Sequence, residues 1–271
     1  SEIIFDRRYG STNTYEKTNY PVGYDLGESG NTPSQNLVDA YEMLDGTSFD
    51  WNNPEHRANP YANRDPRLAM SILTNNVEFK GRNLEVWPGG RDGKGVIHAS
   101  RTGYYLYKFI DPNLDLLQNR TSVHHWVIMR YAEILLSYAE AMNEAYGPTG
   151  NVGYRLNAVR ALNQVRNRVG IEMPAVPSTL TQEELREKIR NERRVELAFE
   201  DHRFWDVRRW MIAPETLGAP LRGVEVTKVS DEGFEYKPVE IEKRTFEPKM
   251  YLYPIPQADL NTTGWPQNPL W

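Results

Sequence analysis

The segment LTQEELREKIRNERRVELAFEDHRFWDVRRWM, residues 180–211, constrains the fold more than any other part of the chain. Thr181 and Glu184 have the spacing of a capping box, in which a hydroxyl and a carboxylate satisfy the first free amides of a helix. Apolar residues then recur three or four positions apart, with one charged interruption after Ile189, at Leu185, Ile189, Val195, Ala198 and Phe199. This period predicts an amphipathic helix over about 183–200, followed by another over about 203–212.

Charged residues interrupt the apolar face of the first of these helices. Glu192 falls one helical turn beyond Ile189, on the side that should be buried. Carboxylates and guanidinium groups remain charged on an inward face only if they pair with one another or with backbone groups. We therefore predict a structural salt-bridge core made of Glu192, Arg193, Arg194, Glu196, Arg203 and Asp206. An acid/base or anion site is the alternative, but no nucleophile, metal-ligand set or phosphate loop lies beside these residues.

Two further apolar stripes precede this segment, one from Tyr131 to Met142 and one from Val152 to Val169. The four helices that the stripes predict between Arg130 and Ile212 have short connections, which favours stacked antiparallel pairs. We expect the helical part to span residues 123–213. Residues 1–122 have loop composition with a short helix and strands, and residues 214–271 are expected to form loop and hairpin.

Composition and motifs exclude several classes of function. A net charge of −5 argues against a nucleic acid as partner, because a phosphate binder needs a positive field. The absence of cysteine excludes thiolate metal sites, and the adjacent His124 and His125 do not have the spacing of helical metal ligands. No metalloprotease, nucleophile-elbow or dinucleotide-binding motif occurs. We expect no catalytic residue, metal or cofactor, although two distant carboxylates could still form a glycoside hydrolase site.

Two tryptophans in loops are the better candidates for ligand binding. Sugars present C–H faces that stack on flat rings, while polar side chains meet their hydroxyl groups. The predicted ligand-binding residues are Trp51, Asn52, Asn53 and Arg57 in one loop and Trp87 and Arg91 in another. The alternative is that each tryptophan anchors its loop to the domain. We assign Tyr104, Tyr105, Trp126, Trp205 and Trp210 to the core.

The string ERRVELAFEDHRFWDVRRW resembles the signature of the SusD/RagB family, the surface nutrient-binding lipoproteins of Bacteroidetes. Other strings typical of that family follow the same order along the chain: TPSQNLVDAYEMLDG at 32–46, NRDPRL at 63–68, TGYYLYKF at 102–109, RYAEILLSYAEAMNEA at 130–145, LNAVRALNQVRNRVG at 156–170, YLYPIPQADL at 251–260 and QNP at 267–269. The family ends its last motif with Gly-Tyr, where this chain has Leu270 and Trp271. The match covers residues 1–271 as a C-terminal domain, so the N-terminal half of the family is expected to be absent from this chain.

The resemblance implies a mainly α fold, with tetratricopeptide-like helical pairs, long loops and a few short β-hairpins. It also implies non-catalytic binding of a glycan or other oligomeric nutrient at the bacterial cell surface, in the outer membrane. The implied partners are a SusC-like TonB-dependent transporter and the N-terminal half of the same protein, which would carry the lipid anchor. Two other classes of function stay open, a helical glycoside hydrolase and a structural adaptor that binds protein.

Overall fold

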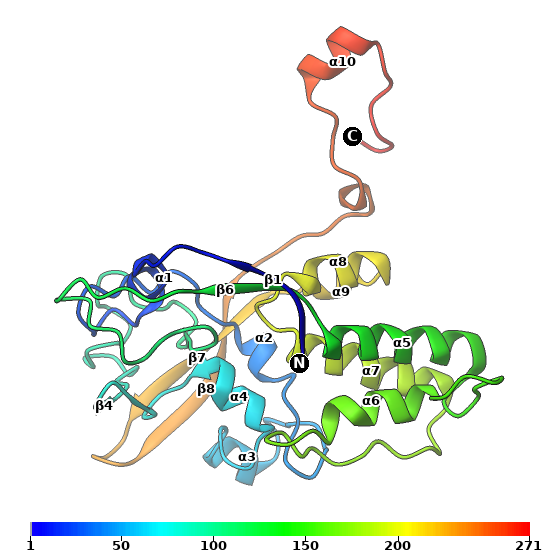
Figure 1. Cartoon of the computed structure of the whole chain (residues 1–271). Helices are drawn as coiled ribbons and strands as arrows, with labels where there is room; N and C mark the ends of the chain where they lie inside the picture. Colours follow the sequence, from blue (N-terminus) through cyan, green and yellow to red (C-terminus); the bar gives the residue numbers. More distant parts are fainter. Residues whose placement is uncertain (1) are drawn as a thin grey trace.

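The computed structural model describes residues 2–271, which form helices and antiparallel pairs of strands (Figure 1). The helices are α1 (Thr14–Asn19), α2 (Gln35–Val38), α3 (Pro54–Ala58), α4 (Pro66–Ser71), α5 (Tyr131–Tyr146), α6 (Ala158–Arg166), α7 (Gln182–Glu196), α8 (His202–Arg209), α9 (Ala213–Thr216), the 3₁₀ helix η1 (Pro248–Tyr251) and α10 (Gln257–Thr263). The strand pairs are β1 (Ile3–Arg8) with β6 (His125–Arg130), β2 (Ile72–Leu73) with β5 (Tyr105–Leu106), β3 (Glu78–Phe79) with β4 (Arg82–Asn83), and β7 (Leu221–Lys228) with β8 (Phe234–Glu242).

The longest helices, α5, α6 and α7, pack on one another (Figure 1). Their apolar stripes meet in one buried cluster, in which Leu136, Leu162 and Leu185 are inaccessible to solvent. Small residues such as Ala139 and Ala161 lie at the same interface and allow the helices to approach closely. The capping box at the start of α7 is present, because Thr181 and Glu184 exchange side-chain and backbone hydrogen bonds. The mainly α fold is therefore confirmed.

The expected start of the helical part is wrong by several residues. His125–Arg130 is strand β6 because it pairs with β1, more than a hundred residues earlier, in the register Arg8 opposite His125. Helix α6 begins only at Ala158, where the side chain of Asn157 accepts from the amide of Arg160 and caps the helix. The stretch before that cap, which we expected to be helical from Val152, contains no helix. Local periodicity cannot reveal a distant strand partner.

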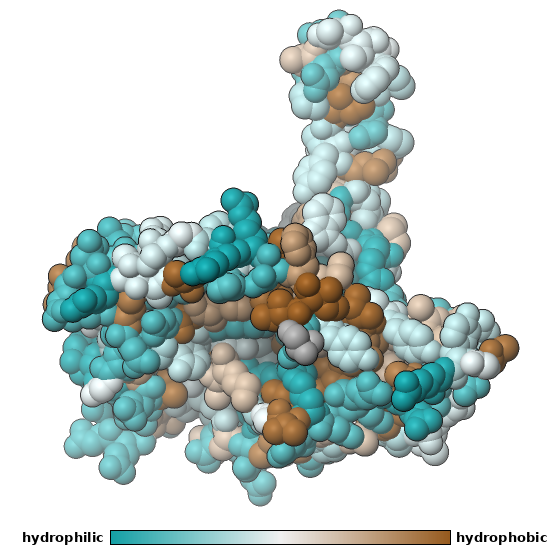
Figure 2. All heavy atoms as spheres, viewed as in Figure 1, coloured by the Kyte–Doolittle hydropathy of each residue, from teal (hydrophilic) through white to brown (hydrophobic). Residues whose placement is uncertain are grey.

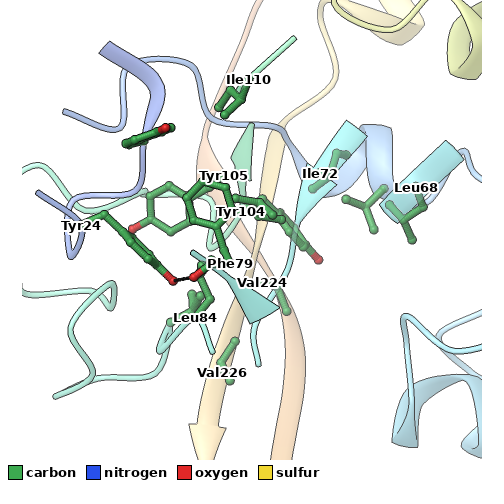
Figure 3. Close-up of a cluster of buried hydrophobic side chains, with 14 of the residues drawn as sticks. Tyr24, Leu68, Ile72, Phe79, Leu84, Tyr104, Tyr105, Ile110, Val224 and Val226 are labelled. Atoms are coloured by element: carbon green, nitrogen blue, oxygen red, sulfur yellow. Dashed lines mark hydrogen bonds between the residues drawn. The ribbon is translucent and has the colours of Figure 1, made fainter. Parts of the chain in front are cut away.

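A second core holds the loop-rich residues together without long helices. Figure 3 shows Tyr24, Phe79, Tyr104 and Tyr105 converging beside Val224 of the β7–β8 hairpin. The hydroxyl of Tyr24 donates to the backbone carbonyl of Phe79 at 2.8 Å, so a buried polar group is satisfied. The hairpin joins this core through its backbone, since the amide of Val224 donates to the carbonyl of Thr102 at 2.8 Å.

The chain after β8 leaves the body of the molecule and ends in η1 and α10 (Figure 1). Arg208 of α8 connects this tail to the body by donating to the carbonyls of Met250 and Tyr251. None of the helices formed by residues 2–271 is long and apolar enough to cross a bilayer.

Apolar side chains are exposed along β1, β6 and the first turn of α5 (Figure 2). We call this surface the apolar ribbon and define it by Ile3, Ile4, Phe5, Ile128, Met129, Tyr131 and Ile134, each at least 40% exposed. These side chains therefore face solvent in the structure of residues 2–271.

Candidate functional site

The carboxylate of Glu192 lies at the centre of a buried network of charges. One of its oxygens accepts from Nη1 of Arg67 at 2.5 Å, and the other accepts from Nη1 of Arg166 at 2.8 Å. Only 1% of Glu192 is exposed, and both arginines are also buried. Because Arg67 belongs to α4 and Arg166 to α6, this one carboxylate on α7 joins the loop-rich part to the helices.

Glu196, one turn further along α7, has three cationic partners. Its oxygens lie 2.6 Å from Arg130, 2.8 Å from Arg67 and 2.8 Å from Arg168. Burial by itself raises the pKa of Glu196, but the three guanidinium groups outweigh burial and lower the pKa to about 2. A general acid for glycoside hydrolysis needs a raised pKa. The arrangement suits a structural role and not acid catalysis.

The remaining predicted members of the salt-bridge core divide into two groups. Arg193 pairs with Asp206 through two hydrogen bonds of 3.0 and 3.2 Å, and both side chains are buried. Arg194 donates to the backbone carbonyl of Asn36 instead of to a carboxylate. The side chain of Arg203 has no hydrogen bond or ion pair within residues 2–271. Arg194 thus pairs with a backbone group, whereas the expected pairing is wrong for Arg203, because the nearby Asp206 is held by Arg193 and Arg209.

The loop of Trp51 is held by bonds within the protein. The indole Nε1 of Trp51 donates to Oδ1 of Asp39 at 3.0 Å, and its ring meets the edge of Phe49. The amide of Asn52 donates to Asp50, and the side chain of Asn53 caps α3. Of the predicted polar residues in this loop, Arg57 alone has an exposed side chain that forms no hydrogen bond or ion pair among residues 2–271.

Trp87 is also fixed by its neighbours. Its ring centroid lies 5.1 Å from that of Phe234 on β8, and the ammonium group of Lys228 lies 5.1 Å from the same centroid. Arg91 forms an ion pair of 2.9 Å with Glu85 in its own loop. The structure thus gives Trp51 and Trp87 separate neighbours and does not bring the two rings into contact. Their local bonds are those expected of loop anchors.

A cleft rich in aromatic residues lies at the other end of the loop-rich part, between α1 and the β1–β6 pair. It has a volume of about 370 Å³. We call it the aromatic cleft and define it by its lining residues Tyr9, Thr12, Thr14, Tyr15, Thr18, Asn19, Asn31, Phe109, His124 and Trp126. The pairing of β1 with β6 forms the cleft, since the amide of Tyr9 donates to the carbonyl of His124 at 2.9 Å.

The rings of the aromatic cleft are held in place from behind. The indole of Trp126 and the ring of Phe109 lie 5.9 Å apart between centroids. His124 lies against Tyr15, and its Nε2 is 2.9 Å from a carboxylate oxygen of the fully buried Glu16. Such support fixes ring orientation before any ligand binds, which lowers the entropy cost of binding.

Polar groups of the aromatic cleft suit a ligand that carries hydroxyl groups. Thr12 and Thr14 share a hydrogen bond of 2.8 Å, and the amide of Asn31 donates to Asn19 at 2.7 Å. The hydroxyl of Thr18 has no hydrogen-bond partner in the part of the chain that the structure describes. Flat rings beside hydroxyl and amide groups are the chemistry that a sugar ring requires.

Sequence reasoning missed this cleft. Residues 9–20, YGSTNTYEKTNY, carry the signal, since tyrosines alternate there with threonine and asparagine. That stretch has ordinary loop composition, however, and Phe109 and Trp126 are about a hundred residues away. The assignment of Trp126 to the core is only partly right, because its side chain is half-buried. Trp205, also assigned to the core, is 63% exposed on α8.

Comparison with known proteins gives the class to which this fold belongs. The model of the SusD family matches residues 1–271, so the chain belongs to the SusD family. Among curated proteins it is similar to SusD-like protein P2 of Formosa agariphila, with 31% identity over 217 residues, which are 76% of this chain and 37% of that protein.

Solved structures agree with this family. A SusD-like protein from Bacteroides fragilis is 31% identical, with a TM-score of 0.79 over 100% of this chain and 54% of that one. A SusD-like carbohydrate binding protein from the same organism is 31% identical, with a TM-score of 0.77 over 96% of this chain and 53% of that one. The chain therefore spans about half the length of these solved relatives.

Proposed function

We propose that this chain binds a glycan or another oligomeric nutrient without converting it chemically. The observation that carries the proposal is the aromatic cleft, where Trp126, Phe109 and Tyr9 lie beside hydroxyl and amide groups. Membership of the SusD family supports it, since one solved relative is described as a carbohydrate binding protein.

The proposal also covers the location of the protein and the transporter that receives its ligand. We expect the whole protein to act at the cell surface, attached to the outer membrane, and to pass its ligand to a SusC-like TonB-dependent transporter. Membership of the SusD family supports a bacterial surface role of this kind. A lipid anchor would belong to the N-terminal half that the family carries.

Catalysis is disfavoured by the lining of the cleft. Glycoside hydrolysis needs a pair of carboxyl groups flanking the scissile bond. No Asp or Glu side chain is among the lining residues of the aromatic cleft in the described part of the chain. Incubation with a glycan that the chain binds should therefore release no reducing ends, and release above the blank would overturn the non-catalytic proposal.

The loop tryptophans remain a second position for the ligand. Our sequence-based prediction places sugar on Trp51 and Trp87, with Asn52, Asn53, Arg57 and Arg91 as polar neighbours. Among these side chains only the exposed Arg57 has no hydrogen bond, ion pair or ring contact in residues 2–271, which favours the aromatic cleft.

Substitution of tryptophans tests the proposal directly. A glycan array identifies a bound oligosaccharide, and isothermal titration then compares Trp126→Ala with Trp51→Ala and with Trp205→Ala. Trp205 is the matched control, because it is exposed and lies outside the cleft. We expect Trp126→Ala to weaken binding by at least about tenfold, from loss of a stacking surface. Unchanged affinity in Trp126→Ala with a loss in Trp51→Ala would place the ligand on the loop instead.

A further inference from the structure

A second hollow, distinct from the aromatic cleft, is lined by an excess of positive charge. It has a volume of about 480 Å³ and lies between α2, the C-terminal end of α7, α9 and the start of β7. Four of its lining residues are arginines, Arg194, Arg203, Arg222 and Arg244, and we call the hollow the arginine groove. Its lining carboxylates are Asp39 and Glu215, and Arg244 also lies 3.2 Å from a carboxylate oxygen of Glu242 outside the lining, so four positive charges meet three negative ones, an excess of one. The chain as a whole has a net charge of −5.

Arg203 differs from Arg222 and Arg244 in that it lacks a direct ion pair, although the charges of Asp206 and Glu187 act on it from further away. It is mostly buried, yet its guanidinium group has no hydrogen bond or ion pair within residues 2–271. Burial lowers the pKa of Arg203, and the neighbouring charge of Arg194 lowers it further, to about 10. The side chain still carries its charge at neutral pH. The donors of a partly buried guanidinium group that lacks a protein acceptor can be satisfied by an anion from outside.

The acidic residues of the groove do not accept hydrogen bonds from Arg203. Both oxygens of Asp39 are already used: Oδ2 lies 2.9 Å from Arg222, and Oδ1 accepts from Trp51 at 3.0 Å and from Gln35 at 2.7 Å. Glu215 is exposed and has no ion pair within the described residues. Arg194 reaches only the carbonyl of Asn36. The donors of Arg194 and Arg203 therefore exceed the acceptors that residues 2–271 provide.

From this arrangement we infer that the arginine groove binds an anionic group, either the carboxylate or the sulfate ester of an acidic sugar. A planar guanidinium fork donates two parallel hydrogen bonds to such a group. Asp39 accepts from both Arg222 and Trp51, so the groove adjoins the first tryptophan loop. The inference rests on the proposed function and narrows it, because the ligand would be an anionic glycan.

The test uses inorganic sulfate and sodium glucuronate as probes, in isothermal titrations of this chain at constant ionic strength set with sodium chloride. We expect one or both probes to bind, and Arg203→Gln to weaken that binding by at least about tenfold. Binding of sulfate alone indicates a sulfate ester, and binding of glucuronate indicates a carboxylate. Arg57→Gln is the matched control, because Arg57 lies outside the groove and has an exposed side chain without a hydrogen bond or ion pair in residues 2–271. No binding of either probe, or equal binding in Arg203→Gln, would overturn the inference.

A second readout separates a binding role from a structural one. Because Arg203 has no partner and lies beside Arg194, removing its charge relieves repulsion when no anion is present. The melting temperature of Arg203→Gln without anion should therefore equal or exceed that of the wild type, whereas a structural arginine would lower it on removal. Arg244→Gln, at an exposed position on the same groove, should also weaken probe binding.

Failure of the inference can be told apart from failure of the proposed function. If neutral oligosaccharides bind through Trp126 and Arg203→Gln leaves that binding unchanged, glycan capture stands and the anionic specificity is refuted. If anions bind in the arginine groove while no glycan binds the chain, the anion site stands and the proposed glycan binding is refuted.

Discussion

Replacement of Glu192 by alanine should destabilise the fold more than any exposed substitution on the same helix. The change removes the acceptor that Arg67 and Arg166 share, while both guanidinium groups stay buried. Loss of one partner from a buried ion pair costs about 3–5 kcal/mol. Both arginines keep other carboxylates, since Arg67 also meets Asp65 and Glu196, and Arg166 also meets Glu42. We therefore expect the lower end of that range, about 3 kcal/mol.

Urea unfolding followed by circular dichroism measures this loss as a shift of the midpoint at constant slope. Glu187→Ala is the matched control, because Glu187 lies on α7, pairs with Arg190 at 2.8 Å and has a side chain that is 68% exposed. An exposed pair of this kind contributes at most about 1 kcal/mol. If Glu192→Ala and Glu187→Ala lower the free energy of unfolding by the same small amount, the network around Glu192 does not hold the helices to the loop-rich part.

Three other predictions follow from the described contacts. The pKa of Glu196 is lowered from 4.5 to about 2 in the folded chain, so the contribution of this carboxylate to stability is complete above about pH 5 and is lost as the pH falls toward 2. Unfolding free energies measured across this pH range should show a loss of about 3 kcal/mol. An unfolding free energy that does not change over this range would contradict the prediction. Gly103→Ala should lower the free energy of unfolding by more than about 1 kcal/mol, because the φ of Gly103 is +80° and an added Cβ would lie 2.6 Å from a backbone oxygen of β7. Gly81→Ala is the control, since Gly81 has a similar φ of +82° but no atom within 4 Å of the added Cβ, and its loss of stability should be smaller. Equal losses in the two variants would refute the predicted clash at Gly103. Phe5→Glu should reduce the concentration-dependent self-association of the chain in sedimentation velocity, because Phe5 is 58% exposed in the apolar ribbon. A wild-type chain that is monomeric at every concentration would contradict this prediction.

Much of α7 could be read from the sequence because its signals are local. The capping box and the apolar spacing lie within one segment, and Leu185, Ile189 and Glu192 are buried as that spacing predicts. The partners of Glu192 could not be identified, because Arg67 and Arg166 are brought to it by other elements, across 125 and 26 positions of sequence.

The same limit explains the errors at the sites. Arg203 shares the charged pattern of its neighbours, but which arginine receives a carboxylate depends on the path of the turn between α7 and α8, where Asp201 has a positive φ of 65°. Tryptophan in a loop was a reasonable signal for sugar binding. The structure shows that Trp51 is hydrogen-bonded to Asp39 and that Trp87 packs against Phe234, while the rings of the aromatic cleft come from segments about a hundred residues apart.

The most direct test of glycan capture is ¹⁹F NMR of the chain labelled with 5-fluorotryptophan, which gives one resonance for each of its 7 tryptophans. Single Trp→Phe variants assign the resonances, and a bound oligosaccharide from the glycan array is then added in steps. We predict that the resonance of Trp126 shifts with ligand concentration while that of the exposed Trp205 stays fixed. A shift confined to Trp51 or Trp87, or no shift at saturating ligand, would contradict binding in the aromatic cleft.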